Sequence, residues 1–410
     1  MKSSVFKGLV LAGIVFSIGC CQASVIRENQ PLHSDISIDF CILDAKYDGK
    51  KLKILEFGGG PRSGFDGYDN YFHRGAVWEL FWNYLDQFKL PMWYLKTPSF
   101  THSAGKKWLE FIAYEKFFEL GGKFALNPEE VEAHVAQFCP IAQDGSYPDY
   151  NGIFLINVSR HRPEYAPINQ AMRKKFSSAV FVNDIANKFV FNKSKSDRLF
   201  REDSLRRFRP KSMVCFKRYN PGLARKIIGT MGCDLFVIKP LNAQYGKGII
   251  FVRSQDLDTM LKIILSPLKK ALSGNDNQAV KFHKRTSRIP LSEAIDYWSV
   301  DSNSRFMIEE YVPSKLVEVE GRKYDATLRV IFTMHCINRQ ITITTLGGYW
   351  KLPTHAVDDE GSLNELHQSY QYDRAIISAP VDPVDMEHIR TLMTTALTPI
   401  YAKMIAQVKK

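Results

Sequence analysis

A lysine and two glycines between two apolar segments form the part of the sequence best suited to chemistry. The segment Phe236–Val252 reads FVIKPLNAQYGKGIIFV, in which one apolar strand delivers Lys239 and a second follows Gly248. Gly246 and Gly248 let backbone amides approach phosphate oxygens closely, because glycine has no Cβ. A lysine on the adjoining strand places a point charge near the same oxygens. The pattern predicts a phosphate site, although a plain hairpin with a glycine turn would look the same.

Further motifs stand in a fixed order around this segment. NKSK (Asn192–Lys195) precedes it, and RFMIEEYV (Arg305–Val312), YDATLRVIF (Tyr324–Phe332) and GSLNELH (Gly361–His367) follow it. This succession, over about residues 185–370, resembles the ATP-grasp superfamily of carboxylate–amine ligases, which includes glutathione synthetase and the ribosomal-protein glutamate ligases. The resemblance implies an α/β fold in which two α+β subdomains clamp a nucleotide, with ATP and Mg²⁺ as cofactors.

The resemblance also implies roles for individual residues. The ATP-binding set comprises Lys193 (with Lys195 as an alternative) and Lys239 as nucleotide-contacting lysines, Gln244, Tyr245, Gly246, Lys247 and Gly248 as a mobile lid, and Glu309, Glu310, Tyr311 and Val312 as the adenine hinge. Arg329 would stabilise the charge of an acyl phosphate, as electrostatic assistance to phosphoryl transfer requires. Asn364 would lie in a loop that closes on the phosphates, and His367 would contact the substrate.

Plain structural alternatives stand beside three of these roles. Lys193 is equally compatible with a solvated charge at a helix start, and Tyr311 with an ordinary core position. Arg329 is compatible with a surface-strand arginine paired with Asp325.

The metal and ribose ligands are where the resemblance fails. The Glu-x-Asn that usually helps to hold magnesium, which neutralises phosphate charge during transfer, has no counterpart on a late apolar strand. The acids available instead are Asp358, Asp359, Glu360, Asp373, Asp382, Asp385 and Glu387, and Glu318 or Glu320 would have to serve the ribose. The metal site is therefore unknown, and a nucleotide binder without turnover is an alternative.

The first half of the chain must supply a domain that precedes the nucleotide-binding one. Strands expected at Leu52–Phe57, Pro91–Leu95 and Gly152–Val158 alternate with helices expected at Ala76–Phe88, Trp108–Leu120 and Pro128–Phe138. This alternation predicts a parallel α/β domain over about residues 40–185, with the ATP-grasp domain over 186–410. The turn Gly58–Tyr68 (GGGPRSGFDGY) is either a structural loop or a site for a substrate anion, and it lacks dinucleotide-binding spacing.

Residues 1–23 have the pattern of an export signal. Lys2 and Lys7 precede an apolar run, Gly8–Gly19, which small residues follow. Cleavage before Ser24 and lipidation of Cys20 are both compatible with it, so a membrane contact is expected only through a lipid anchor at Cys20. An exported location, periplasmic or lipid-anchored, conflicts with a need for cytoplasmic ATP.

The net charge indicates which classes of ligand the protein binds, and the cysteine spacing indicates the state of its thiols. The 410 residues carry a formal net charge of +12, which favours anionic partners such as nucleotides. No nucleic-acid signature accompanies the basic residues, so no nucleic-acid partner is expected. Five cysteines after the leader are widely spaced without a CxxC pair, which indicates mostly buried thiols.

The sequence thus predicts an ATP-dependent ligase that joins a small-molecule or peptide carboxylate to an amine or thiol through an acyl phosphate. The alternatives are a nucleotide-binding protein that has lost turnover, a kinase on the same scaffold, and a non-nucleotide α/β protein with coincidental motifs.

Overall fold

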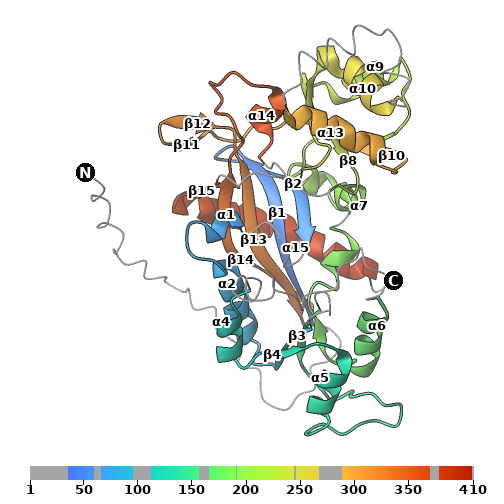
Figure 1. Cartoon of the computed structure of the whole chain (residues 1–410), viewed down its shortest axis with the longest axis vertical. Helices are drawn as coiled ribbons and strands as arrows, with labels where there is room; N and C mark the ends of the chain where they lie inside the picture. Colours follow the sequence, from blue (N-terminus) through green and yellow to red (C-terminus); the bar gives the residue numbers. More distant parts are fainter. Residues whose placement is uncertain are drawn as a thin grey trace, which may run out of the picture.

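The computed structural model describes residues 36–59, 66–95, 112–156, 166–190, 192–243, 246–266, 289–369 and 378–408. The predicted leader and Cys20 lie outside these residues. The described chain forms three larger sheets and one small hairpin, which Figure 1 shows from the side.

A five-stranded antiparallel sheet, here called the central sheet, runs through the middle of the molecule (Figure 1). In sheet order its strands are β15 (Ser378–Pro380), β14 (Gln340–Lys351), β13 (Thr327–Ile337), β1 (Ser37–Tyr47) and β2 (Leu52–Gly59). The expected boundary placed β1 and β2 in the first domain, whereas β1 pairs with β13 of the expected second domain. Nine residue pairs join β1 to β13, almost three hundred residues later. Such a pairing leaves no local signal, because strand propensity does not specify the partner strand.

The two faces of β1 belong to different cores, because successive side chains of a strand point to opposite faces. Cys41, Leu43 and Ala45 are buried in the core that includes helix α15 (Pro383–Val408). Phe40 and Ile42 are buried in the core that includes helix α2 (Ala76–Asp86) and part of the parallel sheet described below. Helical layers thus cover the central sheet on both sides.

The predicted parallel α/β unit is present, below the central sheet in Figure 1. Its strands, in sheet order, are β4 (Lys123–Ala125), β3 (Met92–Leu95), β5 (Ile153–Ile156) and β6 (Val180–Phe181), all parallel. Its helices are α1 (Asp66–Asp69), α2, α4 (Tyr114–Glu119), α5 (Pro128–Val135) and α6 (Ala166–Lys175). Within the Gly58–Tyr68 turn, residues 60–65 lie outside the described residues.

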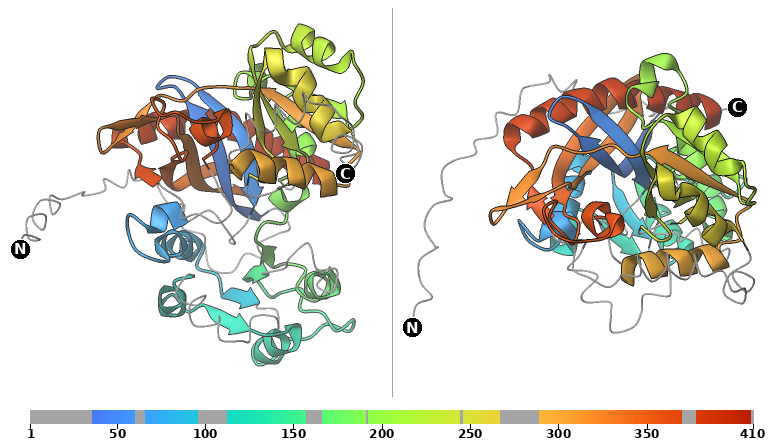
Figure 2. Two further views of the ribbon diagram at one scale, coloured as in Figure 1. Left: turned by 45° about the horizontal axis from the view of Figure 1, so that its top comes forward. Right: turned by 90° about the horizontal axis from the view of Figure 1, so that it is seen from above.

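A four-stranded antiparallel sheet carries the lysine–glycine segment. Its strands, in sheet order, are β7 (Ser212–Phe216), β10 (Arg305–Glu310), β8 (Leu235–Pro240) and β9 (Ile250–Arg253). Helices α9 (Leu223–Met231), α10 (Leu257–Leu265) and α13 (Ile289–Val300) pack on it and form its core. Gly232 ends α9 in the left-handed conformation (φ 65°), which glycine adopts most readily. Figure 2 shows this sheet and its helices beside the central sheet.

The remaining elements connect these units. They are α7 (Lys193–Arg198), α8 (Asp203–Arg206), the hairpin β11 (Val317–Val319) and β12 (Arg322–Tyr324), and α14 (Leu363–His367). Among the described helices, none combines the length and apolar character needed to cross a bilayer. The five described cysteines are all free thiols, and Cys41, Cys215 and Cys336 are buried.

A buried carboxyl group lies where β1, α15 and the chain entering the second half meet. Asp39 Oδ2 accepts a hydrogen bond from Tyr401 Oη (2.6 Å), and Oδ1 accepts one from the amide of Ala186 (2.8 Å). Burial raises the pKa of Asp39 to about 7, with a smaller contribution from Asp184. The native state therefore favours the protonated carboxyl group.

Asp39→Asn is expected to remove a pH-dependent loss of stability. The folded-state pKa lies above the unfolded value, so the native state binds more protons between about pH 4 and pH 7. Stability from this group therefore falls as pH rises through that window, by roughly 4 kcal/mol in total. Asparagine keeps the shape without ionising. Urea unfolding at several pH values should show that the free energy of unfolding of the mutant increases relative to that of the wild type as the pH rises from 4 to 7.

The exposed substitution Asp203→Asn, whose carboxylate is 95% accessible, serves as the control and should track the wild type. A constant difference between Asp39→Asn and wild type across the window would contradict the assignment.

Candidate functional site

One face of the central sheet changes from apolar to charged along β1. Alternate residues of Ile38–Ile42 are buried against α2 and the parallel unit, and the next two positions on that face are Asp44 and Lys46. Strand pairing places Glu56 of β2 and Arg329 of β13 on either side of Asp44. The sheet register thus assembles a row of charged side chains from segments far apart in the sequence.

Asp44 holds two cations. Arg329 donates to both carboxylate oxygens, from Nε (2.7 Å) and from Nη2 (2.8 Å), and Lys351 Nζ donates to Oδ2 (2.7 Å). Burial alone would raise the pKa of Asp44, but Arg329 and Lys351 hold it well below its usual range. Burial, together with Arg329, lowers the pKa of Lys351 to about 8. The bidentate geometry fixes the guanidinium plane of Arg329.

Lys46 lies beside this group on the same face of β1 and is 4% exposed. Its Nζ donates to Oδ1 of Asp325 (2.9 Å) and to the carbonyl oxygens of Asp325 (3.1 Å) and Ala326 (3.0 Å). The other carboxylate oxygen of Asp325 lies 3.0 Å from Nδ1 of His367, which is also 2.9 Å from the hydroxyl of Tyr311. Asp325 therefore links the central sheet to α14 and to the end of β10.

The four-stranded sheet contributes a second buried ionic group. Lys239 on β8 pairs with Oε2 of Glu309 on β10, and Arg209 Nη2 donates to Oε1 of the same carboxylate (2.8 Å). All three side chains are buried. Burial alone would raise the pKa of Glu309, but Lys239 and Arg209 lower it below its ordinary value. Arg209 also donates to the carbonyl of Ile54 on β2 (2.9 Å), so the group joins the two sheets.

Lys193 completes the connection between the sheets. At the start of α7, its Nζ donates to the carbonyl of Ala243 (2.5 Å) and lies 3.2 Å from Oε1 of Glu56. Lys193 helps to lower the pKa of Glu309, and burial together with Lys239 lowers the pKa of Lys46. The charged groups of the two sheets therefore act on one another across a single region.

We call this region the cation cluster. Its cations are Lys46, Lys193, Arg209, Lys239, Arg329 and Lys351, and its carboxylates are Asp44, Glu56, Asp197, Glu309 and Asp325. In Figure 1 it corresponds to the place where β8 and β10 adjoin the ends of β1 and β2, next to α7. Each cation contacts a carboxylate, which allows the cluster to stay together without a ligand.

The glycine loop after β8 has a backbone conformation that favours glycine. Gly246 and Gly248 have positive φ angles of 69° and 70°. A Cβ on Gly248 would lie 2.7 Å from atoms of Pro240 and of Tyr297, and Trp298 Nε1 donates to its carbonyl (2.7 Å). Only glycine meets both the backbone and the packing requirements here. The lid residues Gln244 and Tyr245 lie outside the described residues, and Lys247 is exposed.

Asn364 holds the strand that follows this loop. Its Oδ1 accepts from the amide of Phe251 (3.1 Å) and its Nδ2 donates to the carbonyl of Ile249 (2.8 Å). Gln368 Nε2 donates to the carbonyl of Gly246 (3.0 Å). A capping box at Ser362 starts α14 and so positions these side chains. Asn364 is thus bound to the base of the loop, and its predicted approach to phosphates stays a prediction.

The expected adenine hinge lies at the end of β10. The amide of Glu310 donates to the carbonyl of Lys211 (2.9 Å), and that of Tyr311 donates to the carbonyl of Leu235 (2.9 Å). Within the described part of the chain, no hydrogen-bond partner is recorded for the amide of Val312. The N–H of Val312 is therefore available to a ligand, and the side chain of Glu309 binds Lys239 and Arg209. The hinge role of these residues stays a prediction.

The structure brings together much of the predicted site but changes individual partners. Lys193, Lys239 and Arg329 all belong to the cation cluster, and Tyr311 meets His367 at its edge. The alternative reading of Lys193 as a solvated charge is wrong, because its side chain is 7% accessible. Arg329 does not pair with Asp325 as its alternative reading supposed; its partner is Asp44. Glu318 and Glu320, the ribose candidates, are exposed on the β11–β12 hairpin.

Several members of the cation cluster were missed by the sequence reasoning. They are Asp44, Lys46, Glu56, Arg209 and Lys351. One signal was available: Asp44 and Lys46 interrupt an apolar strand at alternate positions, and charged residues inside buried strands are rare unless they are paired. Lys351, at the end of GGYWK, has the same character. Their partners were not readable from the sequence.

The described residues do not by themselves form a complete metal site. Among them, no group of three or more acidic, histidine or cysteine side chains has the geometry to hold a metal. The predicted acids have other contacts: Asp359 with Arg322, Asp382 with the first amides of α15, Asp385 with Lys315, and Glu387 with Arg390. Asp373 lies outside the described residues, and Asp44, Glu309 and Asp325 are occupied by cations.

Comparison with solved structures finds distant likenesses. A protein assigned as a gamma-glutamylcysteine synthetase from Methylobacillus flagellatus is 12% identical over 92% of this chain and 91% of its own, with a TM-score of 0.44. D-alanyl-alanine synthetase A from Vibrio cholerae is 12% identical over 76% and 81%, with a TM-score of 0.34. The D-alanine-D-alanine ligase from Coxiella burnetii is 9% identical over 68% and 80%, with a TM-score of 0.25.

No protein-family model matches the sequence, and no curated protein matches it significantly. With identities this low, the roles of residues have to follow from this chain's own geometry. A parallel α/β unit is inserted before a four-stranded and a five-stranded antiparallel sheet that share the cation cluster. In fold class the chain is therefore the α/β protein that its resemblance to the ATP-grasp superfamily predicted.

Proposed function

We propose that the cation cluster binds the triphosphate of ATP and that the protein is an ATP-dependent ligase. The observation that carries the proposal is the convergence of six cationic side chains from the two antiparallel sheets and their connections, beside a glycine loop with positive φ angles. Exposed amides of such a loop and neighbouring ammonium groups are what phosphate oxygens bind. The carboxylates hold the cations in place until phosphate oxygens replace them.

The proposed role of each residue follows from its place in the two sheets. Lys193 and Lys239 lie nearest the glycine loop and would contact the phosphates, and the N–H of Val312 would bind the adenine ring. Arg329 and Lys351 lie on the central sheet, on the other side of Glu56, where the reacting carboxylate would be held. In this order, Lys239 pairs with Glu309, Lys193 with Glu56, and Lys351 with Asp44.

The proposed reaction has two steps. A substrate carboxylate oxygen attacks the γ-phosphorus, the bond from that phosphorus to ADP breaks, and an acyl phosphate forms. An amine then attacks the acyl carbon, inorganic phosphate leaves, and the amine loses a proton to give an amide. Arg329 would stabilise the charge on the acyl phosphate. The resemblance to ATP-grasp ligases also implies Mg²⁺, which phosphate oxygens and one or two carboxylates would hold and which would neutralise phosphate charge.

A nucleotide-binding protein without turnover is the second candidate. The pairing of every cluster carboxylate with a cation favours it, because phosphoryl transfer relies on a metal to neutralise the phosphates. The two candidates share the binding site and differ only in release of phosphate.

Arg329→Gln is expected to separate binding from turnover. Full-length protein with ATP, Mg²⁺ and pooled amino acids and dipeptides should release inorganic phosphate, measured colorimetrically. Loss of one stabilising donor should reduce that rate about 10²–10³-fold. The dissociation constant for ATP should change little, because Arg329 would meet the acyl group rather than the base.

Arg390→Gln, which removes an exposed guanidinium on α15, is the matched control and should behave as wild type. ATP binding without phosphate release in the wild type would select the binding protein. Absence of both would reject the nucleotide site.

A further inference from the structure

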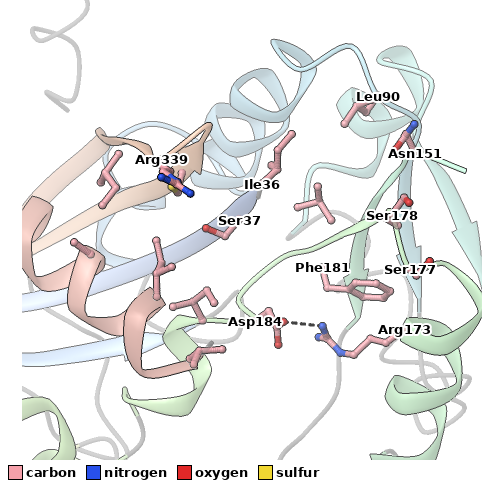
Figure 3. Close-up of a pocket in the computed structure, with 18 residues that line it drawn as sticks. Ile36, Ser37, Leu90, Asn151, Arg173, Ser177, Ser178, Phe181, Asp184 and Arg339 are labelled. Carbon is pink, nitrogen blue, oxygen red and sulfur yellow. Dashed lines mark ion pairs between the residues drawn. The ribbon is translucent and has the colours of Figure 1, made fainter. Parts of the chain in front are cut away.

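A second cavity lies far from the cation cluster, between the parallel unit and the opposite end of the central sheet. Its volume is about 470 Å³, within the range of small-molecule sites. Figure 3 shows Ile36, Ser37 and Arg339 on the side of the central sheet and Arg173 with Asp184 across from them. Domain interfaces are common places for such sites.

The cavity and the proposed nucleotide site lie at opposite ends of β1. Ser37 lines the cavity at the first residue of β1, and Lys46 belongs to the cation cluster nine residues further along the same strand. At about 3.3 Å per residue the two lie roughly 30 Å apart. A ligand of this size in one site does not reach the other.

The cavity has one positive charge in excess. Arg173 and Asp184 form an ion pair at 2.8 Å, and Arg173 also lies over the ring of Phe181. Arg339 is exposed at the rim, and no ion pair is recorded for it within the described residues. The hydroxyl groups of Ser177 and Ser178 also line the wall. A single anionic group therefore matches the polar part of the cavity.

Arg339 stands where the backbone disfavours it. Ile337 pairs with Gln340, so Asn338 and Arg339 form a two-residue turn between β13 and β14, with φ angles of 49° and 66°. Turns of this kind favour glycine at the second position, because a side chain is strained at positive φ. A strained residue that lines a cavity points to a role beyond the turn itself.

The rest of the cavity is apolar. Leu90 comes from the parallel unit, Ile341 from β14, and Ala402 and Ile405 from one side of α15. These side chains give the cavity an uncharged lining. An occupant must therefore combine a negative group with an apolar body.

We propose that this cavity binds a small carboxylate with an apolar body of about the size of a medium-chain acid, with its carboxylate on Arg339. Carboxylates pair well with guanidinium groups, and apolar burial against the α15 wall supplies the remaining affinity. The site is independent of the nucleotide and needs no turnover.

Octanoate is the probe, compared with the neutral 1-octanol and the cationic octylamine, by titration calorimetry on the full chain. Octanoate is expected to bind with a dissociation constant of about 1 mM or lower, and the two others at least ~10-fold more weakly. Arg339→Gly should weaken octanoate binding at least ~10-fold while its Tm equals or exceeds that of wild type, because glycine relieves the turn. With an unchanged or higher Tm, a loss of octanoate binding in this variant is not a result of misfolding.

A second variant tests the cavity instead of the charge. Ala402→Trp leaves Arg339 in place but fills the space beside α15, and it should also abolish octanoate binding. Arg390→Gln removes an equal charge elsewhere on α15 and should bind octanoate as wild type does. Equal binding of octanoate and 1-octanol, no octanoate binding to wild type, or unchanged octanoate binding in Arg339→Gly or in Ala402→Trp would each overturn the proposal.

Discussion

Glu309→Gln is expected to lower the free energy of unfolding by about 3–5 kcal/mol, because it removes a buried carboxylate that serves two buried cations. Glu309 is 1% exposed, and Lys239 and Arg209 both contact it. A neutral amide leaves two positive charges together in a poorly solvated place. Urea unfolding of wild type and mutant at pH 7 measures the difference.

The neighbouring residue offers a matched control. Glu310 follows on the same strand and accepts a hydrogen bond from the amide of Lys211 (2.8 Å), but it is less buried and has no buried cation to neutralise. Glu310→Gln should cost about 1 kcal/mol or less. Equal unfolding midpoints for the two variants would contradict the interpretation.

The pH dependence of the stability difference between wild type and Glu309→Gln is a second test of the role of Glu309. The pKa of Glu309 in the folded protein lies below its ordinary value of 4.5. Its contribution to stability is therefore present above the unfolded-state pKa and is lost as the pH falls through the folded-state pKa. The difference between wild type and Glu309→Gln should shrink in acid and stay constant from about pH 6 to pH 8.

Lys239→Ala is expected to weaken ATP binding by about 100-fold. The substitution removes a cation-cluster ammonium group that comes from the strand preceding the glycine loop. Charge-assisted contacts of this kind contribute about 1.5–3 kcal/mol each. Titration calorimetry with ATP measures the change. Circular dichroism melts check that the fold persists, since Glu309 retains Arg209 as a partner.

Lys226→Ala is the matched control, because this lysine is exposed on α9 of the same subdomain. It should leave ATP affinity within about twofold of wild type. An unchanged affinity in Lys239→Ala would place the nucleotide elsewhere or remove it from the protein altogether, while leaving the separate carboxylate cavity untouched.

Local elements could be predicted because their signals lie within a few residues. The apolar run ending at Lys239 is β8, the helix after Pro221 stops at Gly232, and the glycines of the loop adopt positive φ angles. Periodicity and the conformational freedom of glycine act over one turn or one hairpin, so a single sequence carries them. The alternation of strands and helices likewise predicted the parallel unit correctly.

The pairing of distant segments was not predictable in this way. A strand such as β1 carries no mark of which partner it will take, and its true partner β13 lies almost three hundred residues away. The strand pairing therefore crosses the expected domain boundary. The same pairing places Asp44 against Arg329, whereas the sequence suggested its near neighbour Asp325.

The sequence by itself determined the phosphate-loop segment, the order of the motifs and the alternating character of the first unit, because these depend on local backbone preference. Only the tertiary structure decided which carboxylate neutralises each lysine and arginine, and that Arg339 borders a cavity shared with α15. Electrostatic pairing and cavity shape depend on distances between remote segments, and those distances exist only after the sheets have formed.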